Sequence, residues 1–289
     1  FNRAGYLSQQ AYSMIWAGNQ KSTFSELKAI YNAGINASIC GQIYWGFDIG
    51  GFSGELPSVE LYYRANQLAL FSPIMQVHSE PVGGQFSIND PVREFNNERT
   101  IWNMAKSYNC DEINKDISSY YRFRMNLIPY IYSENLKALN RNKTIMKHMN
   151  IDYYGDFLLN QYIFGELIVS VVLDEGINQV SVILPTDKNF YDIFTNKIYR
   201  NKNTIKLTKI KDMCIFAKEG TALVTKEKSL YPSTIDSFLE YSSLYFRLYG
   251  KKGEYNFVDD NFDFVIRWNN SSYSIEGQTG CNIVVEYIF

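Results

Sequence analysis

The sequence lacks the features that mark several classes of protein. Its four cysteines are far apart and form no C-x-x-C pair, so they suggest neither a zinc site nor a disulfide framework. No apolar run approaches the ~20 residues of a membrane-spanning helix. There is no glycine-rich phosphate loop and no G-x-S-x-G element. We therefore expect no metal, no cofactor and no membrane partner.

The sequence also has no strong excess of charge of either sign. The 28 basic and 30 acidic residues leave a formal net charge of −2, which provides no basic field for nucleic acid. What is abundant is apolar and aromatic side chains, at 46% and 16% of 289 residues. The apolar content suffices for a core of one large or two ordinary domains. The aromatic excess fits two interpretations, core packing or stacking against the faces of sugar rings.

Residues 1–150 alternate between helical and strand patterns. Thr23 and Glu26 form a capping box at the start of a helix, and Gly34 is a plausible stop for it. An apolar run at 39–47 predicts a strand that ends at Asp48. Further helices are expected at the following ranges: 59–71 with Ser58 as its cap, 98–106, and 113–139 divided or kinked by Pro129.

The pattern changes after residue 152. Short β-type segments separated by turn residues occupy 167–173, 179–184, 204–208, 213–217 and 282–289. Helices alternating with strands favour parallel βαβ units in the first half. The sequence therefore predicts an α/β region followed by an all-β region.

Polar and aromatic side chains follow the predicted strands of the first half. They are Arg3, Trp16, Asn19, Asp48 and His78. In a β/α barrel the active site lies at the carboxyl ends of the strands, so these side chains would meet there. Together they would form a polar floor suited to sugar hydroxyls. Any one of them alone would more readily be interpreted as an ordinary loop residue.

Taken together, these segments resemble glycoside hydrolase family 31, which includes α-glucosidases and α-xylosidases. The order and spacing of the segments are as in the family, and the resemblance covers roughly residues 1–225. The segments are 3–10 (RAGYLSQQ), 16–20 (WAGNQ), 44–52 (YWGFDIGGF), 60–64 (ELYYR), 71–78 (FSPIMQVH), 124–133 (RMNLIPYIYS), LP at 184–185 with YD at 191–192, and 220–223 (GTAL).

The resemblance implies a fold and a division into domains. Residues 1–150 would be the C-terminal half of a (β/α)8 TIM barrel. Residues 151–230 would form a proximal β-sandwich domain. Residues 231–289, which match the family poorly, would be a divergent or truncated distal β-region.

The resemblance also implies a chemistry. The family hydrolyses α-glycosides with retention, using a carboxylate nucleophile and a carboxylic acid that protonates the leaving oxygen. Arg3 would line the subsite of the reacting sugar, Asp48 and His78 would hydrogen-bond its hydroxyls, and Trp16 and Phe52 would pack on its faces. The implied partner is an α-linked oligosaccharide or glycoside. Hydrolysis and transglycosylation both remain open.

Two departures from the family pattern stand out. The acid/base aspartate of the family corresponds to Asn19, whose amide has no proton to give at neutral pH. The nucleophile of the family belongs to a segment upstream of the arginine segment, at which this sequence begins. Because a barrel does not close from its last strands alone, we expect the N-terminal half to come from the same precursor or from a second chain.

These departures leave alternatives to a working hydrolase. A non-catalytic carbohydrate-binding relic, or pseudoenzyme, fits Asn19 and the absent nucleophile segment. A structural β-domain without a sugar site is disfavoured by the joint presence of Arg3, Asp48 and His78. The lack of a leader and of paired cysteines favours a cytoplasmic location. The lysines between 197 and 211 are expected to line a solvated β-edge rather than a polyanion site.

Overall fold

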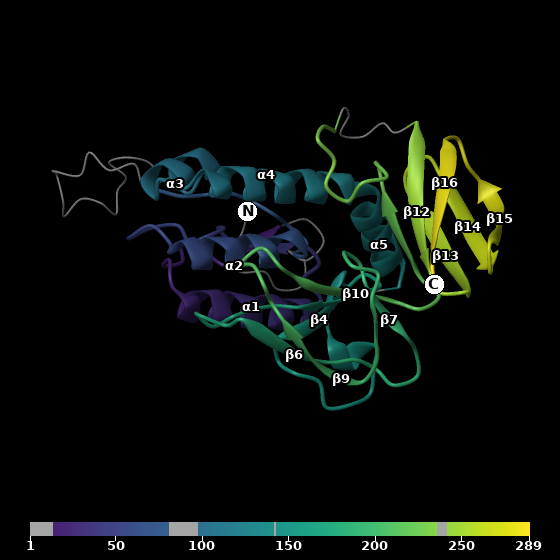
Figure 1. The fold of residues 1–289 in the computed structure, drawn as a ribbon, viewed down its shortest axis with the longest axis horizontal. Helices are drawn as coiled ribbons and strands as arrows, with labels where there is room; N and C mark the ends of the chain where they lie inside the picture. The colour runs from purple at the N-terminus through teal and green to yellow at the C-terminus, as the bar shows by residue number, and fades with distance from the viewer. Residues whose placement is uncertain (1–13, 81–97, 142, 236–241) are drawn as a thin grey trace.

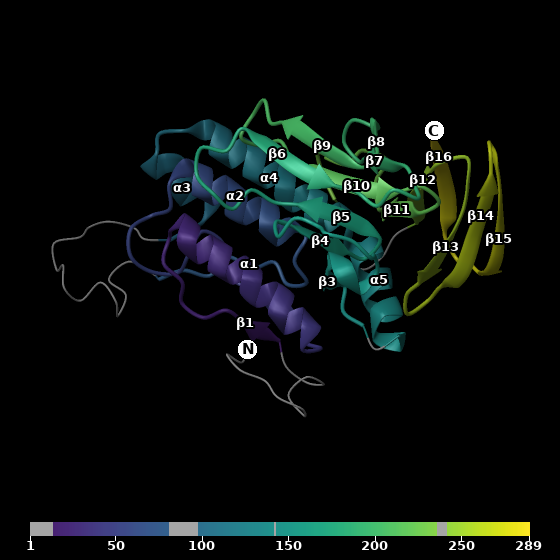
Figure 2. The same ribbon diagram turned by 90° about the horizontal axis from the view of Figure 1, so that it is seen from below.

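A computed structural model describes residues 14–80, 98–141, 143–235 and 242–289. Arg3 and its segment lie outside these ranges. Helices from the first half gather at one end of the molecule, a six-stranded sheet lies in the middle, and the last strands lie at the other end (Figure 1). Figure 2 shows α1, α2 and α4 beside one another, with β14 and β15 farthest from them.

The first half contains five helices and two short strands among the described residues. In chain order they are β1 Ile15–Trp16, α1 Phe24–Ile39, β2 Trp45–Gly46, α2 Val59–Leu70, α3 Ile101–Ser107, α4 Asp111–Asn126 and α5 Ile128–Asn140. The remainder is β-structure with one short 3-10 helix. Its elements are β3 Met146–His148, η3 Met149–Ile151, β4 Gln161–Phe164, β5 Leu167–Ser170, β6 Gln179–Ile183, β7 Phe190–Asp192, β8 Ile198–Tyr199, β9 Lys202–Lys206, β10 Cys214–Lys218, β11 Ala222–Thr225, β12 Ser243–Tyr249, β13 Lys252–Val258, β14 Asp263–Asn269, β15 Ser272–Gln278 and β16 Asn282–Ile288.

The helix starts predicted from capping residues are confirmed. Thr23 Oγ1 accepts a hydrogen bond of 3.2 Å from the backbone N–H of Glu26, and Ser58 Oγ accepts one of 3.2 Å from Leu61. Each bond satisfies a backbone donor that the first turn of a helix leaves without a partner. Pro129 lies in the first turn of α5, so the long helical run is divided there into α4 and α5.

The predicted end of the first helix at Gly34 is wrong, because α1 continues to Ile39. Gly34 packs against β2 instead. A Cβ added to it would lie 2.6 Å from the ring of Trp45, so only a glycine lets that ring approach the helix. The expected strand at 39–47 is correspondingly short and comprises only Trp45–Gly46.

The parallel pairing expected in the first half is confirmed, and the second half is all-β as expected. The later strands pair antiparallel except β12 and β16, which are parallel. β1 and β2 are parallel. The six-stranded sheet, in the order β3-β4-β5-β10-β7-β8, is antiparallel throughout, and β6 pairs with β9. Two three-stranded sheets follow, β11-β12-β16 and β13-β14-β15. The fold class is therefore a partial barrel followed by β-sandwich structure. Because β11 pairs with β12, one sheet crosses residue 230, and the division there stays a prediction.

Buried tyrosines join the helical layer to the six-stranded sheet. Tyr31 on α1 donates its hydroxyl hydrogen to the carbonyl of Gln161 at 3.2 Å. Tyr162 on β4 donates to the carbonyl of Phe71 at 3.0 Å, at the end of α2. Both rings are almost fully buried, and both hydroxyls have a partner, as buried polar groups require. At these positions the aromatic side chains serve core packing.

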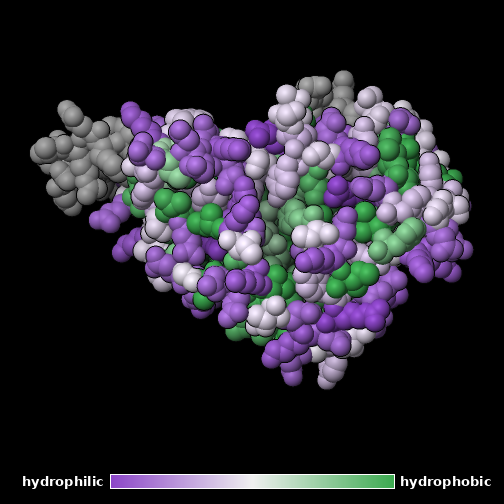
Figure 3. Space-filling model, in the orientation of Figure 1, coloured by the Kyte–Doolittle hydropathy of each residue, from purple (hydrophilic) through white to green (hydrophobic). Residues whose placement is uncertain are grey.

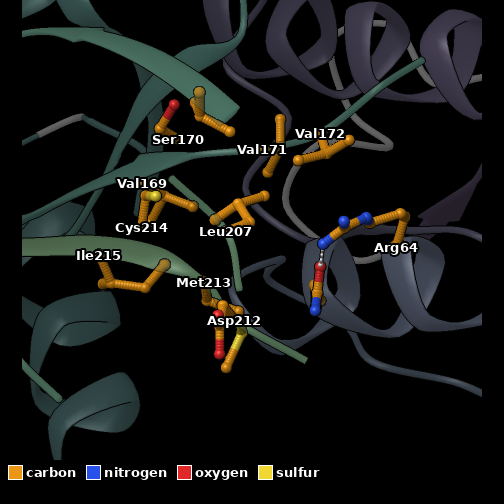
Figure 4. Close-up of a pocket in the computed structure, with 12 residues that line it drawn as sticks. Arg64, Val169, Ser170, Val171, Val172, Leu207, Asp212, Met213, Cys214 and Ile215 are labelled. Carbon is orange, nitrogen blue, oxygen red and sulfur yellow. Dashed lines mark hydrogen bonds between the residues drawn. The ribbon is translucent and has the colours of Figure 1, made fainter. Parts of the chain in front are cut away.

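Two buried arginines hold the same junction. Arg124 donates hydrogen bonds to the carbonyls of Leu70 and Pro73, and its guanidinium lies 5.8 Å from the ring centroid of Phe164. Arg64 reaches from α2 toward the β-strands and donates 3.0 Å hydrogen bonds to Gln67 and to the carbonyl of Ile210 (Figure 4). The space beside Arg64 is a cavity of about 10 Å³, which is about the smallest volume that can hold one water molecule. This junction is therefore packed and is not a ligand site.

No helix in the described part of the chain combines the length and the apolar character needed to cross a membrane.

Candidate functional site

Three segments of the chain run parallel and side by side in the first half. Ile15 pairs with Trp45 in the β1–β2 ladder, and Ile74 donates its backbone N–H to the carbonyl of Trp45 at 3.0 Å. Farther along, Asp48 and Gln76 form a parallel bridge. The carboxyl ends of the three segments therefore lie together, as the barrel interpretation requires. Trp16, Asp48 and His78 follow from these ends.

Asp48 lies at the centre of this arrangement and is fully buried. Its Oδ1 accepts a hydrogen bond of 2.9 Å from Gln76 Nε2 and lies 3.5 Å from His78 Nδ1. Its backbone N–H donates to Gln20 Oε1 at 3.3 Å. Burial raises the pKa of the Asp48 carboxyl, and hydrogen bonds from Gln76, His78 and Trp16 partly oppose this increase. The site thus holds a carboxylate that burial makes costly to ionise and that surrounding donors support.

His78 and Phe52 form the exposed side of the site. Their ring centroids lie 4.9 Å apart with the planes inclined by 60°. The His78 side chain is 56% exposed, so one face of this pair is open to solvent while Nδ1 points to Asp48. The pair therefore presents a surface that a ligand can contact next to Asp48.

Backbone hydrogen bonds tie together the loops that follow the three segments. Phe52 donates its N–H to the carbonyl of Gln20 at 2.8 Å, and its own carbonyl accepts from Glu80 at 2.9 Å. The buried Arg99 donates to Ser22 Oγ and to the carbonyl of Glu55 at 3.2 and 3.1 Å. These bonds link residues far apart in sequence and give the site a rigid frame.

Asn19 follows β1 and is exposed. Gly18 precedes it with φ of +92°, a left-handed conformation that favours glycine, and so turns the chain after Trp16. The side chain of Gln20 donates back to the carbonyl of Gly18 and closes this turn. Asn19 therefore lies at the rim of the site and Trp16 lies beside its buried carboxylate. Arg3 is outside the described residues, and its assigned role stays a prediction.

Sequence reasoning missed three residues that hold the site, namely Gln20, Gln76 and Arg99. For Gln76 a signal was present. It precedes His78 by two positions, and alternate residues of an extended segment point to the same side. Gln20 and Arg99 act through turns and loops, for which no periodicity exists. Among the described residues there is no cluster of three or more His, Cys, Asp and Glu side chains that could hold a metal ion.

The chain matches a known family over most of its length. Residues 1–134 match the glycosyl hydrolases family 31 TIM-barrel domain, and residues 142–223 match the glycosyl hydrolase family 31 C-terminal domain. The short gap between the two matches, residues 135–141, lies at the end of α5, where the helices give way to the sheets. The chain belongs to glycoside hydrolase family 31.

Two proteins with named activities are similar to this chain in sequence. The chain is 35% identical to an isomaltosyltransferase of Sporosarcina globispora over 86% of this chain and 23% of that protein. It is 32% identical to a 1,3-alpha-isomaltosidase of Kribbella flavida over 68% of this chain and 26% of that protein. The chain therefore spans about a quarter of the length of these relatives.

Two solved structures have a fold similar to that of this chain. The fold matches a cycloalternan-forming enzyme from Listeria monocytogenes, solved in complex with a pentasaccharide substrate, with a TM-score of 0.83 and 30% identity over 95% of this chain and 27% of that one. It also matches the family 31 alpha-xylosidase of Xanthomonas citri with a TM-score of 0.75 and 25% identity, over 95% of this chain and 32% of that one.

Proposed function

We propose that this chain forms the sugar-binding part of a family 31 catalytic centre that cleaves or transfers α-linked glucosyl units with retention. One observation carries the proposal. The buried Asp48 carboxylate, supported by Gln76, His78 and Trp16, lies at the carboxyl ends of adjacent parallel segments. That is where a β/α barrel places its active site.

Each side chain has a role that its surroundings suit. Asp48 would accept hydrogen bonds from sugar hydroxyls, because a carboxylate is the strongest such acceptor among side chains. His78 is held by Asp48 through Nδ1, and its exposed ring would offer the second nitrogen to a hydroxyl. Phe52 and Trp16 would pack against the sugar, with Phe52 held by its contact with His78.

A retaining mechanism needs two carboxyl groups about 5–5.5 Å apart. We place the nucleophile in barrel strands outside these 289 residues, supplied by the same precursor or by a second chain. The chain spans about a quarter of its relatives, which leaves room for those strands. The relatives named isomaltosyltransferase and 1,3-alpha-isomaltosidase favour an α-linked glucose oligosaccharide as the substrate.

Asn19 would stand at the position of the acid/base group. Its exposed place at the rim suits contact with the leaving oxygen, but an amide cannot protonate that oxygen. This residue supports a second candidate function, a carbohydrate-binding protein of the same ancestry without catalysis.

The substitution Asn19→Asp in the natural gene product distinguishes the catalytic function from the non-catalytic carbohydrate-binding function. We expect hydrolysis of a nitrophenyl α-glucoside to rise by about 10²–10⁴-fold, the usual contribution of general acid catalysis. The substitution Asn19→Gln, which keeps the amide, is the matched control and should change little. Sugar binding without activity in all three proteins would favour the second candidate. High activity that Asn19→Asp does not increase would refute the assignment of Asn19.

A further inference from the structure

A second cavity lies away from Asp48, on the face shown in Figure 3. It has a volume of about 670 Å³, within the range of about 300–1,000 Å³ typical of small-molecule sites. One wall is α4, and the other is formed by the turns around β7, β8 and β9. We call it the α4 cavity. None of the residues that hold Asp48 lines it. Apolar side chains are visible near the middle of this face, with polar ones around them (Figure 3).

One side of the α4 cavity is aromatic. The ring of Tyr231 is stacked on Phe194, with centroids 6.0 Å apart and planes inclined by 17°, and it also packs on Phe123 at 5.2 Å. Tyr231 is nevertheless 40% exposed, so part of it remains open toward the cavity. The next residue, Pro232, is tied to α4 because its carbonyl accepts a 2.9 Å hydrogen bond from Arg122 Nε. The aromatic surface is therefore held in place before any ligand arrives.

Two carboxylates in the cavity are fixed in orientation. Asp192 Oδ1 accepts from the backbone N–H groups of Phe194 and Thr195 at 2.9 and 2.8 Å. Asp212 Oδ2 accepts from the backbone N–H groups of Thr208 and Lys209 at 2.7 and 2.8 Å. The Thr195 side chain also supports Asp192. Because a carboxylate has about four acceptor positions, each of the two can still accept a bond from a ligand.

Donors surround these acceptors. Lys115, Lys197 and Lys206 line the cavity and form no salt bridge within the described part of the chain, whereas Lys211 pairs with Asp116 at 3.0 Å. The charge of Lys197 nevertheless acts on Asp192 and partly opposes the increase in the pKa of that carboxyl. Thus the lysines that the sequence assigned to a solvated β-edge lie partly around a cavity.

The cavity is lined by side chains of both charges. The acidic ones are Asp116, Asp192 and Asp212, and the basic ones are Lys115, Arg122, Lys197, Lys206 and Lys211. Acceptors and donors therefore stand together beside an aromatic surface, a combination that suits a neutral ring that carries many hydroxyls.

We propose that the α4 cavity binds a neutral α-linked oligosaccharide, with a sugar ring against Tyr231 and hydroxyls on Asp192, Asp212 and the rim lysines. The identity of the sugar rests on the proposed function. The cavity would serve as an accessory site that holds the substrate chain outside the catalytic centre.

The test is titration calorimetry of the natural protein carrying Asp48→Asn, which weakens the Asp48 site, with isomaltose and with maltotriose. We expect binding of one or both sugars to persist. Tyr231→Ala should weaken it at least about tenfold, the loss expected when a stacking surface and its hydrophobic contact are removed. Thr195→Trp should do the same by filling the cavity from an exposed turn, without removing any core ring. Tyr273→Ala, at an exposed tyrosine of β15, is the matched control and should leave binding unchanged.

Three results would overturn the proposal. They are no binding of either sugar, binding that neither Tyr231→Ala nor Thr195→Trp weakens, and displacement of the sugar by inorganic phosphate. Circular dichroism of each variant checks that it is folded, and Thr195→Trp remains informative if Tyr231→Ala is not. If the protein lacks glycosidase activity but binds sugar in a way that depends on Tyr231, the proposed function is contradicted and the α4 cavity is not. If the protein is active but shows no sugar binding that depends on Tyr231, the α4 cavity is contradicted and the proposed function is not.

Discussion

The side-chain amide of Gln76 donates a hydrogen bond of 2.9 Å to Asp48 Oδ1, the same oxygen that lies 3.5 Å from His78 Nδ1. Gln76 and His78 therefore bind one carboxylate oxygen from the same extended segment. The orientation of Asp48 therefore depends on a residue that lies within the family-like segment 71–78 but to which the resemblance assigns no role.

The first prediction concerns Gln76. Gln76→Glu replaces the donor with a second carboxyl, and two carboxyls at this distance cannot both be ionised without strong repulsion. We expect the two carboxyls to share one proton and to release it only above the pH at which a lone carboxyl ionises. Once that proton is released, both groups are charged and repel each other. Sugar binding at the Asp48 site should therefore be weak at neutral pH and recover as the pH is lowered. Binding measured by calorimetry from pH 5 to pH 8 tests this.

Gln76→Met is the companion variant. It removes the hydrogen bond without adding charge, and should weaken binding at every pH in that range. A flat pH profile for Gln76→Glu, equal to that of Gln76→Met, would show that Gln76 does not act through the ionisation of Asp48.

The second prediction uses the raised pKa of Asp48. The ordinary value is 3.8, and burial places the folded value above it. Below both values the carboxyl is protonated in both states. As the pH rises between them, the unfolded state releases its proton first, so the free energy of unfolding falls and then stays low at neutral pH. Asp48→Asn keeps an acceptor oxygen without the buried charge.

We therefore expect Asp48→Asn to be more stable than the wild type near pH 7 and equal to it below pH 3.8, in urea unfolding at a series of pH values. The matched control is Asp152→Asn. The pKa of Asp152 is lowered by Lys147 and Lys143, so this variant should lose stability at neutral pH instead. A loss of stability in Asp48→Asn at neutral pH would show that the donors around Asp48 outweigh its burial.

The third prediction concerns Gly34. Gly34→Ala would place a Cβ 2.6 to 2.9 Å from the ring of Trp45, which is itself buried. We expect a destabilisation of about 1–3 kcal/mol from overpacking, offset only in part by the ~1 kcal/mol that alanine gains over glycine in a helix. Urea unfolding measures it.

The double variant Gly34→Ala with Trp45→Phe tests the cause, because the smaller ring should relieve the overlap and recover part of the loss. Simple additivity of the two single changes would mean that the ring of Trp45 is not what excludes a side chain at position 34.

The fourth prediction concerns Arg124, which joins α4 to the end of α2 and to β4. Arg124→Met would leave the buried carbonyls of Leu70 and Pro73 without their donor. We expect a loss of about 2–4 kcal/mol in the free energy of unfolding. Arg141→Met, at the exposed end of α5, is the control and should stay within about 0.5 kcal/mol of the wild type. An equal effect of the two substitutions would contradict the role given to Arg124.

The sequence predicted the parts of the site that follow from local pattern. An apolar run before Asp48 and a glycine pair after it indicated a strand that ends in a carboxylate, and the order of the motifs identified the family. The hydrogen bonds made by Gln20, Gln76 and Arg99 were not predicted, because they join residues that lie 28 to 77 positions apart in the sequence. Gly34 was misjudged for the same reason. Its local signal is that of a helix end, and the packing of Trp45 against it is visible only in three dimensions.

The central claim is that Asp48 holds the reacting sugar. The most direct measurement is kcat/KM for a nitrophenyl α-glucoside in the natural gene product carrying Asn19→Asp, with and without Asp48→Asn. Loss of a charged hydrogen bond to substrate predicts a fall of at least about tenfold. Asp152→Asn in the same background should leave kcat/KM unchanged. An Asp48→Asn protein that is as active as its parent would contradict the account.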